Sequence, residues 1–393
     1  MANENKKNIF YDPSLIKRHR KDKTFKFLAV TALISSLMFL AIFLTDMVAK
    51  GSSAFSQTYI QVEVTYNEKT VSNSRKAIDR KYRKLISRAW LRDLPRSVEN
   101  NPELMDTKQM VWALADDQVD MYMKEQYYKL KSKDLATLKV LIEEGKVEKR
   151  FNTIFFTHGD SKIAENSGIL SAVVGTIFTL LVTMAVAFPI GVATAVYLEE
   201  FADPDSRWSS IIEININNLA AIPSILFGLL GLAIFINLFG MPRSSPLVGG
   251  LTLALMTLPI IIVSSRAALR SVPASIRQAG YGLGLTKIQV VRDHVLPLAF
   301  PGVMTGSIIG LAQAMGETAP LIIVGMIAFI PDSPTSIMDA ATVMPAQIFT
   351  WAGMPEKAYI ERTAAGILVL LTILISLNTL AVYLRKKFEV KWQ

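Results

Sequence analysis

One acidic residue stands inside an otherwise apolar stretch of the sequence. Glu317, followed by Thr318, lies about midway along the apolar run 303–330. An ionisable group inside a membrane is costly unless it is paired or hydrated. Such a carboxylate could gate a polar path or position an arginine, and the alternative is a fixed structural pair with an arginine. An intramembrane enzyme built on Glu317 would need a second catalytic group, and none follows at motif spacing.

Basic and polar residues that could contact a solute lie near other apolar runs. Arg266 is the best basic candidate, because a guanidinium holds phosphate or carboxylate through two parallel hydrogen bonds. Anchoring by the positive-inside rule explains Arg266 equally well, and it is the preferred explanation of Arg270. Asn218 and Ser224 lie on either side of Pro223, where a broken helix would present polar groups to a substrate. Helix packing explains these two nearly as well.

Several chemistries are excluded by what the sequence lacks. It has no cysteine, and its three histidines are scattered singly, so we expect no metal and no cofactor. No G-x-x-x-x-G-K-S/T loop is present to hold nucleotide phosphates, so this chain is not expected to be an ATPase itself. The net charge of +9 would favour nucleic acid in a soluble protein. Here the basic residues cluster beside apolar runs, so we expect no nucleic-acid partner.

The inner loop, residues 272–302, is too patterned for a spacer. Apolar spacing predicts a short helix before Gly284, which supplies a turn, and a second helix before Pro297. A helix pair that projects from a membrane span can seat in a groove of another protein and transmit a rigid-body movement. An ATPase partner would need such a contact.

Six apolar runs are long enough to cross a membrane, whose hydrocarbon layer needs roughly 20 residues of helix. They lie near residues 27–45, 169–198, 219–239, 247–263, 303–330 and 365–384. Hydrophobic residues make up 51% of the chain and gather in these runs. The sequence therefore predicts an all-α polytopic membrane protein with six transmembrane helices.

The charge distribution predicts an orientation in the cytoplasmic (inner) membrane. A basic arm over residues 1–26 precedes the first transmembrane helix at 27–48, and excess positive charge keeps such an arm in the cytoplasm. Six crossings return the basic tail 385–393 to the cytoplasm. Five helices then form a core over 169–384. The polar start of the chain argues against a cleavable signal peptide, so we expect the first run to be retained.

The insert, residues 50–166, is predicted to be a small α+β domain outside the membrane. A half-buried strand is indicated by the alternating apolar residues Ile60, Val62, Val64 and Tyr66. Residues 151–157 give a second strand that could pair with it. Helical spacing predicts a helix over 78–89, and two more are expected to end near residues 130 and 145. The basic face of the 78–92 segment could attract an anion or an acidic partner, or could simply be solvated.

The inner loop resembles a motif of ABC importer permeases, written E-A-A, three residues, G, nine residues, I, any residue, L-P. The places of this motif are taken here by Gln278, Ala279, Gly280, Gly284, His294, Leu296 and Pro297. Three letters depart from the motif, at Gln278, Gly280 and His294. Gln278 keeps hydrogen bonding but lacks the charge of the family's glutamate.

Further segments are similar to the phosphate ABC transporter permease of PstA type. They are LSAVVGTIFTLL from Leu170, PIGVATAVYLEEF from Pro189, NNLAAIPSILFGLLGLAIF from Asn217 and AMGETAPLII from Ala314. The resemblance covers about 169–384 and implies the type I ABC importer permease fold of six transmembrane helices. It implies a phosphate transport subunit that is not itself an enzyme, because a partner hydrolyses the ATP.

The resemblance also implies sites and partners. The translocation path would include Glu317, Thr318, Arg266, Asn218 and Ser224. The ATPase coupling loop would include Ile276, Arg277, Gln278, Ala279, Gly280, Gly284, Leu296 and Pro297. Expected partners are a second homologous permease (PstC-like), a dimeric ATPase (PstB-like) and an extracytoplasmic phosphate-binding protein (PstS-like). The alternatives are a permease for sulfate or molybdate, or a membrane-anchored sensor or scaffold.

Overall fold

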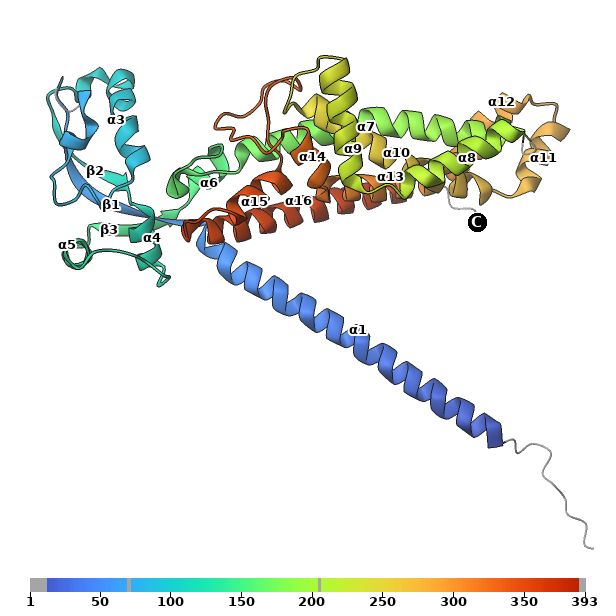
Figure 1. Cartoon of the computed structure of the whole chain (residues 1–393), viewed down its shortest axis with the longest axis horizontal. Helices are drawn as coiled ribbons and strands as arrows, with labels where there is room; N and C mark the ends of the chain where they lie inside the picture. The colour runs from blue at the N-terminus through green and yellow to red at the C-terminus, as the bar shows by residue number, and fades with distance from the viewer. Residues whose placement is uncertain (1–12, 69–71, 204–205, 389–393) are drawn as a thin grey trace, which may run out of the picture.

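The computed structural model describes residues 13–68, 72–203 and 206–388, so parts of the predicted basic arm and tail lie outside the described residues. The molecule is elongated (Figure 1). The insert forms one end, a helical bundle forms the body, and two short helices, α11 (Ala274–Gly282) and α12 (Lys287–Val290), stand at the other end. Helix α1 (Pro13–Ser53) diverges from the bundle and meets it only near its C-terminal end.

Long apolar helices make up the bundle. They are α7 (Leu170–Val196), α8 (Arg207–Ala220), α9 (Ser224–Gly231), α10 (Pro246–Arg270), α13 (Leu296–Gly316) and α16 (Ala358–Phe388). Three π-helical segments extend them: η4 (Tyr197–Phe201), η5 (Leu232–Leu238) and η6 (Val291–Val295). Within the described ranges, five helices are long and apolar enough to cross a membrane, or six if the bent pair α8 and α9–η5 is one span. The predicted polytopic helical class is confirmed.

Two of the predicted spans are not continuous helices. The run 219–239 contains a bend of 104° between α8 and the continuous helix α9–η5. Helix α9 begins directly after Pro223. The run 303–330 is broken because α13 ends at Gly316, and a short helix, α14 (Ala319–Ile323), follows. A proline disfavours helical backbone in the residue before it, and Pro320 lies in the first turn of α14. Both corrections involve helix breaks that apolarity alone does not reveal.

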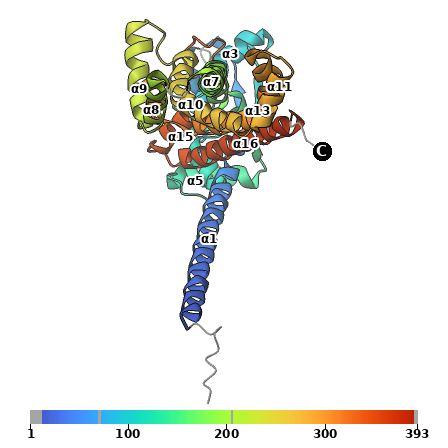
Figure 2. The same cartoon turned by 90° about the vertical axis from the view of Figure 1, so that its right-hand side faces the viewer.

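Helix α10 lies at the centre of the bundle and packs closely on α7 and α13. A Cβ on Gly250 would lie 2.5 Å from Val182 Cβ of α7, and a Cβ on Gly302 of α13 would lie 2.6 Å from Ala268 Cβ. Small residues at these contacts let the helix backbones approach, as is usual in membranes. Seen along the long axis, α7, α10, α13 and α16 lie side by side while α1 leaves them (Figure 2).

The insert contains a three-stranded antiparallel sheet in the order β2-β1-β3. The strands are β1 (Ser56–Thr65), β2 (Lys108–Leu114) and β3 (Val147–Phe151), and the helices are α3 (Arg88–Asn100), α4 (Asp117–Met123), α5 (Ser132–Glu143) and α6 (Thr153–Thr157). Three short 3₁₀ turns are η1 (Ser74–Ala77), η2 (Pro102–Leu104) and η3 (Ala164–Asn166). The predicted strand at Ile60–Tyr66 is confirmed, since its alternate side chains are buried in the core of the insert.

Three details predicted for the insert were wrong. Most of 151–157 is the helix α6, and the strand that pairs with β1 ends at Phe151. Residues 78–87 form turns in place of a helix, because the Leu85 carbonyl accepts from Asp116 N–H and Ile86 bridges to Ala115. The helix expected to end near residue 130 ends at Met123, whereas α5 does end close to residue 145.

A buried ionic network joins the insert to the bundle. Lys124 Nζ lies 2.6 Å from Asp120 Oδ2 and 2.9 Å from Glu361 Oε1, and all three side chains are almost fully buried. Ser53 Oγ, at the end of α1, donates to Glu361 Oε2 over 2.8 Å. The helix α15 (Met344–Ala352), in the connection before α16, packs against α7 and α16. The insert therefore rests on the first turn of α16 through charged groups that water does not reach.

Candidate functional site

The inner loop folds into the two helices α11 and α12, as predicted. Gly284, between them, has φ of +78°, a backbone conformation that residues with a Cβ rarely adopt. Helix α12 begins with a capping box, in which Gln289 N–H donates to Thr286 Oγ1 and Thr286 N–H donates to Gln289 Oε1. Local sequence signals therefore determine where each helix ends and begins.

Large apolar side chains are exposed on this helix pair. Tyr281, Leu283 and Ile288 are 45%, 81% and 64% exposed, and Gln278 and Ala279 are exposed as well. We call these five residues the inner apolar surface. Exposed apolar patches of this kind mark contact sites for other proteins or for membranes. Short helices that present apolar side chains are suited to a groove in a partner.

The opposite faces of α11 and α12 are fixed to the bundle. Ile276 and Leu296 pack against the buried residues around Val290 and Val295. Gly280 sits so close to Val290 that an added Cβ would lie 2.7 Å from Val290 Cγ2. This contact accounts for glycine at a motif position where the family has alanine. Pro297 lies in the first turn of α13, directly after the π-helical segment η6, where a proline interrupts the regular backbone hydrogen bonds of a continuous helix.

Arg277 ties α11 to two other elements. Its guanidinium contacts Glu200 of η4, with 3.2 Å between Nε and Oε2, and the Glu200 side chain is 5% exposed. It also donates to the Val272 and Leu269 carbonyls over 2.8 and 3.0 Å. The hydrogen bond to Glu200 raises the pKa of Arg277, so the guanidinium stays charged. Arg277 therefore holds α11 against the inner ends of α7 and α10.

A second set of ion pairs lies beside the first. Arg266 Nε lies 3.4 Å from Glu199 Oε2, and Arg266 Nη1 lies 3.2 Å from Glu213 Oε1 of α8. Arg270 Nε lies 2.8 Å from Glu199 Oε1. The inner ion cluster thus comprises Glu199, Glu200, Glu213, Arg266, Arg270 and Arg277. It connects η4, α8, α10 and α11 at the inner end of the bundle.

The three glutamates of the inner ion cluster were missed by the sequence reasoning. Their signal was the adjacent acidic pair Glu199–Glu200 at the end of an apolar run whose neighbours carry arginines. Adjacent residues on a helix point in different directions, and here the two carboxylates bind different arginines. No group of three metal-ligating side chains occurs among the described residues, so they present no metal centre.

Glu317 lies at the break between α13 and α14. It directly follows Gly316, the last residue of α13, and its backbone is extended. Its N–H donates to the Ala314 carbonyl over 3.3 Å. Its carboxylate is half-buried, and within the described part of the chain it makes no ion pair or side-chain hydrogen bond. Thr318 begins α14 and is half-buried as well. Such a carboxylate is available to pair with a cationic group that approaches it in another conformation or that belongs to another subunit.

Asn218 and Ser224 lie on either side of the bend between α8 and α9. Asn218 is exposed and Ser224 is half-buried. Helix α9 packs on α14, and a Cβ on Gly228 would lie 2.7 Å from Pro320 Cα. The two helix breaks of the bundle therefore belong to neighbouring elements.

The structure does not bring Arg266 to Glu317. Gly306 of α13 packs on Ser264, close to Arg266, and Glu317 follows Gly306 by eleven residues, roughly 16 Å along a helix. Arg266 instead contacts Glu199 and Glu213. The residues predicted for one path thus fall into two groups, one at the helix breaks and one at the inner ion cluster.

Two protein families match the sequence. Residues 187–390 match the family described as binding-protein-dependent transport system inner membrane component. Residues 12–89 and 72–132 match a family described only as a domain of unknown function, DUF3333. The first match contains the inner ion cluster, both helix breaks and the helix pair α11–α12. The second covers α1 and much of the insert.

Individual relatives point the same way. The phosphate transport system permease protein PstA 1 of Mycobacterium tuberculosis is 30% identical over 56% of this chain and 70% of its own length. The phosphate transport system permease protein PstC of Pasteurella multocida is 30% identical over 61% of this chain and 82% of its own length. A chain of the inward-facing MetNI methionine ABC transporter covers 56% of this chain at 17% identity, with a TM-score of 0.45. This chain belongs to the family of binding-protein-dependent transport system inner membrane components, the multi-pass permease subunits of ABC transporters.

Proposed function

We propose that this protein is the permease subunit of an ATP-driven importer of inorganic phosphate. The observation that carries the proposal is the helix pair α11–α12, which exposes an apolar surface on a base fixed by the inner ion cluster. The printed names of the relatives favour phosphate as the cargo. A separate ATPase would hydrolyse ATP, because the sequence has no loop that could hold its phosphates.

The inner apolar surface would seat in a groove of that ATPase. Helix α12 continues through η6 into α13, so a push on α12 passes directly into a membrane span. The same push on α11 reaches α7 and α10 through Arg277 and its partners Glu200 and Leu269. Three spans would therefore move together when the ATPase closes, as rigid-body switching requires.

Glu317 would act at the translocation path as a gate. A carboxylate repels phosphate, so it is unsuited to first contact with the anion. Because it has no partner within the described residues, it can pair with a cation in one state of the cycle and release it in another. Thr318, Ser224 and Asn218 would line the path near the helix breaks. Arg266, held loosely by two glutamates, would offer its guanidinium to phosphate when those contacts separate.

The complex would contain further subunits. We expect a second homologous permease (PstC-like), a dimeric ATPase (PstB-like) and an extracytoplasmic phosphate-binding protein (PstS-like). Six crossings would place both termini in the cytoplasm, with the insert outside, as the basic residues near the two ends favour. In this arrangement the insert faces the binding protein, and the inner apolar surface faces the ATPase.

Uptake of labelled phosphate into vesicles tests the proposal. The complete complex should import phosphate when ATP is supplied on the cytoplasmic side, and excess sulfate or molybdate should not compete. Leu283→Asp should abolish import because it places a charge on the most exposed apolar residue of the inner apolar surface, whereas Lys139→Gln in the insert should not. Competition by sulfate would indicate that the transported anion is a different oxyanion. No ATP-dependent uptake of any oxyanion would refute transport and favour a membrane-anchored sensor.

A further inference from the structure

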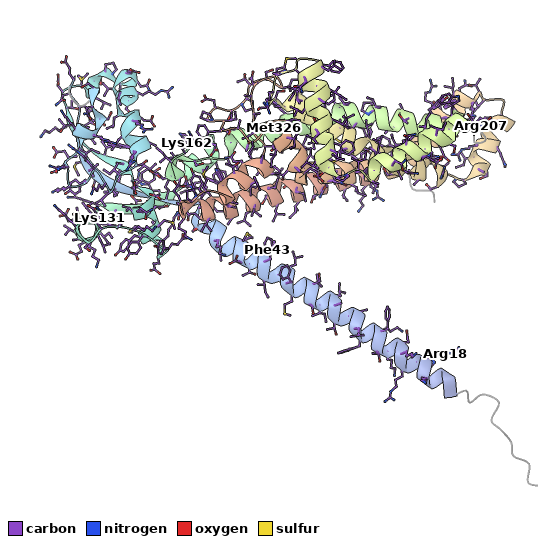
Figure 3. The ribbon with its side chains drawn as sticks, viewed as in Figure 1. Arg18, Phe43, Lys131, Lys162, Arg207 and Met326 are labelled. Atoms are coloured by element: carbon purple, nitrogen blue, oxygen red, sulfur yellow. The ribbon has the colours of Figure 1, made fainter. Side chains whose placement is uncertain are left out.

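The insert contains a surface cavity of about 530 Å³ with an unusual concentration of positive charge. Six cationic side chains around it are Arg75, Arg80, Arg83, Arg88, Lys129 and Lys131. A seventh, Lys84, lies 3.9 Å from Asp134, and the other acid at the cavity is Asp116. Seven cations and two acidic residues give a formal net charge of +5 (7 − 2) when both acids are counted as ionised. The cavity lies at the end of the molecule opposite the inner apolar surface (Figures 1 and 3).

Rigid backbone supports the cationic side chains. Leu85 and Ile86 are fully buried, and they are fixed by the Asp116 N–H to Leu85 carbonyl bond of 2.9 Å and by the bridge from Ile86 to Ala115. The segment between them and η1 is held by Arg83, whose Nε donates to the Ile78 carbonyl over 3.0 Å. Arg80 and Arg83 are therefore presented by a turn whose backbone is fixed, and Arg75 of η1 and Arg88 of α3 lie on either side of it.

Lys131, labelled in Figure 3, adds a second feature. It precedes the first residue of α5 and makes no side-chain cap to that helix. The first N–H groups of a helix that lacks a side-chain cap attract anions. Arg75, Arg80, Arg88 and Lys131 form no ion pair with any described residue. Cations that repel one another without partners gain most from a shared anion.

Asp116 does not neutralise this charge at pH 7. Burial, together with its hydrogen bond to Asp117, raises the pKa of Asp116 to about 8. The carboxyl therefore stays largely protonated at neutral pH, and its oxygen still accepts from the Gln118 N–H at the start of α4. If these basic residues formed only a solvated surface, neither the concave shape of the cavity nor the uncapped start of α5 would be required.

We propose that this cavity of the insert binds a phosphate-bearing anion with several negative charges. Guanidinium groups hold phosphate oxygens through paired hydrogen bonds, which suits a cavity lined mostly by arginine. The phosphate group could belong to free inorganic phosphate or polyphosphate, or to the headgroup of an anionic phospholipid. This site is separate from the translocation path, and it does not depend on which anion the permease transports.

Binding to the complete complex in nanodiscs of neutral lipid tests the site. Calorimetric titrations with inorganic phosphate and with tripolyphosphate measure the free anions, and flotation with phosphatidylglycerol vesicles measures the lipid source. The variant Arg80→Gln/Arg88→Gln removes two lining cations. The matched control, Lys139→Gln/Lys149→Gln, removes two exposed lysines of the same domain that do not line the cavity. Phosphate uptake is measured in parallel, so loss of transport is distinguished from loss of this site.

We expect wild type and the control to bind alike, and the Arg80→Gln/Arg88→Gln variant to bind about tenfold or more weakly, since each lost charged hydrogen bond is large. Binding should weaken as salt is added, because the site is exposed. Tighter binding of tripolyphosphate than of vesicles identifies a free anion, and the reverse identifies a headgroup. The proposal is overturned if none of the three probes binds, or if both variants lose affinity equally.

Discussion

Three glycines of the α11–α12 pair should respond differently to the same change to alanine. At Gly280 the new Cβ would lie 2.7 Å from Val290 Cγ2, well inside ordinary contact distance. Overpacking of this kind costs about 1–3 kcal/mol, more than the gain of about 1 kcal/mol from helix propensity. At Gly282 no atom lies within 4 Å of the added Cβ, so that gain should remain. At Gly284, φ of +78° makes alanine costly by about 1–2 kcal/mol.

Hydrogen exchange of the amides in α11 and α12 measures these effects directly in the purified complex. We expect Gly280→Ala and Gly284→Ala to lower protection by about tenfold, which corresponds to 1.4 kcal/mol, and Gly282→Ala to leave it unchanged or raise it. Phosphate uptake should fall with protection at Gly280 and Gly284. At Gly282, a loss of uptake without a loss of protection would indicate a contact with the ATPase.

A second substitution separates the clash at Gly280 from other causes. Val290→Ala removes both Cγ atoms, so Gly280→Ala/Val290→Ala should be more stable than the sum of the single changes by about 1 kcal/mol. Val290 is fully buried, so Val290→Ala alone should lower protection through the cavity it leaves. The reasoning fails if Gly282→Ala is as damaging as Gly280→Ala, or if the double variant loses as much protection as the two single changes added together.

Three further predictions concern charged groups. Arg277→Met should lower the stability of the complex by about 3 kcal/mol in thermal unfolding, because Glu200 would stay buried without its cation, and adding Glu200→Gln should recover part of the loss. Asp116 is protonated in the folded insert up to about pH 8 but ionises near pH 4 when unfolded, so its stabilisation is full below pH 4 and is lost as pH rises through about 8. Thermal unfolding from pH 4 to 9 should therefore vary less in Asp116→Asn, which keeps the helix cap. Glu317→Gln should reduce uptake while the complex still assembles with unchanged thermal stability, since the carboxylate has no partner to lose among the described residues; failure to assemble would contradict a gating role.

Local patterns predicted the elements whose formation depends on near neighbours. Alternating apolar residues identified β1, and Gly284 with the apolar spacing around it identified the α11–α12 pair. The predicted helix over 78–89 was wrong because Leu85 and Ile86 pair with the residues that directly follow β2. These partners lie about 30 positions further along the chain, so local spacing does not reveal them. Periodicity reports which side chains are buried, and Ile78, Leu85 and Ala89 of the predicted helical pattern are indeed buried. It does not report which backbone geometry buries them.

A broken helix was expected at Pro223, and the break at Glu317 could have been predicted from residues already in view. Gly316 and Pro320 bracket Glu317, and glycine and proline are the residues that end and restart helices. Hydropathy averaged over a run hides them, because both residues are tolerated in apolar spans. The inner ion cluster could not have been assembled in this way. It joins residues from 199 to 277, and nothing in their spacing tells which glutamate meets which arginine.

The insert is joined to the end of the bundle opposite α11 and α12 by a buried ionic network and is not merely tethered to it. Lys124 is 4% exposed and forms ion pairs with two carboxylates, those of Asp120 in the insert and Glu361 in α16. Pulling the insert away would leave Glu361 without its cation in a site that also contains the Ser53 hydroxyl at the end of α1. An unpaired buried charge costs several kcal/mol, so separation is opposed by more than the loss of apolar contact. Helix α16 in turn packs on α13, the span that continues from α12. An anion that altered the insert would therefore act on helices that the proposed movement of the inner apolar surface reaches from the other end.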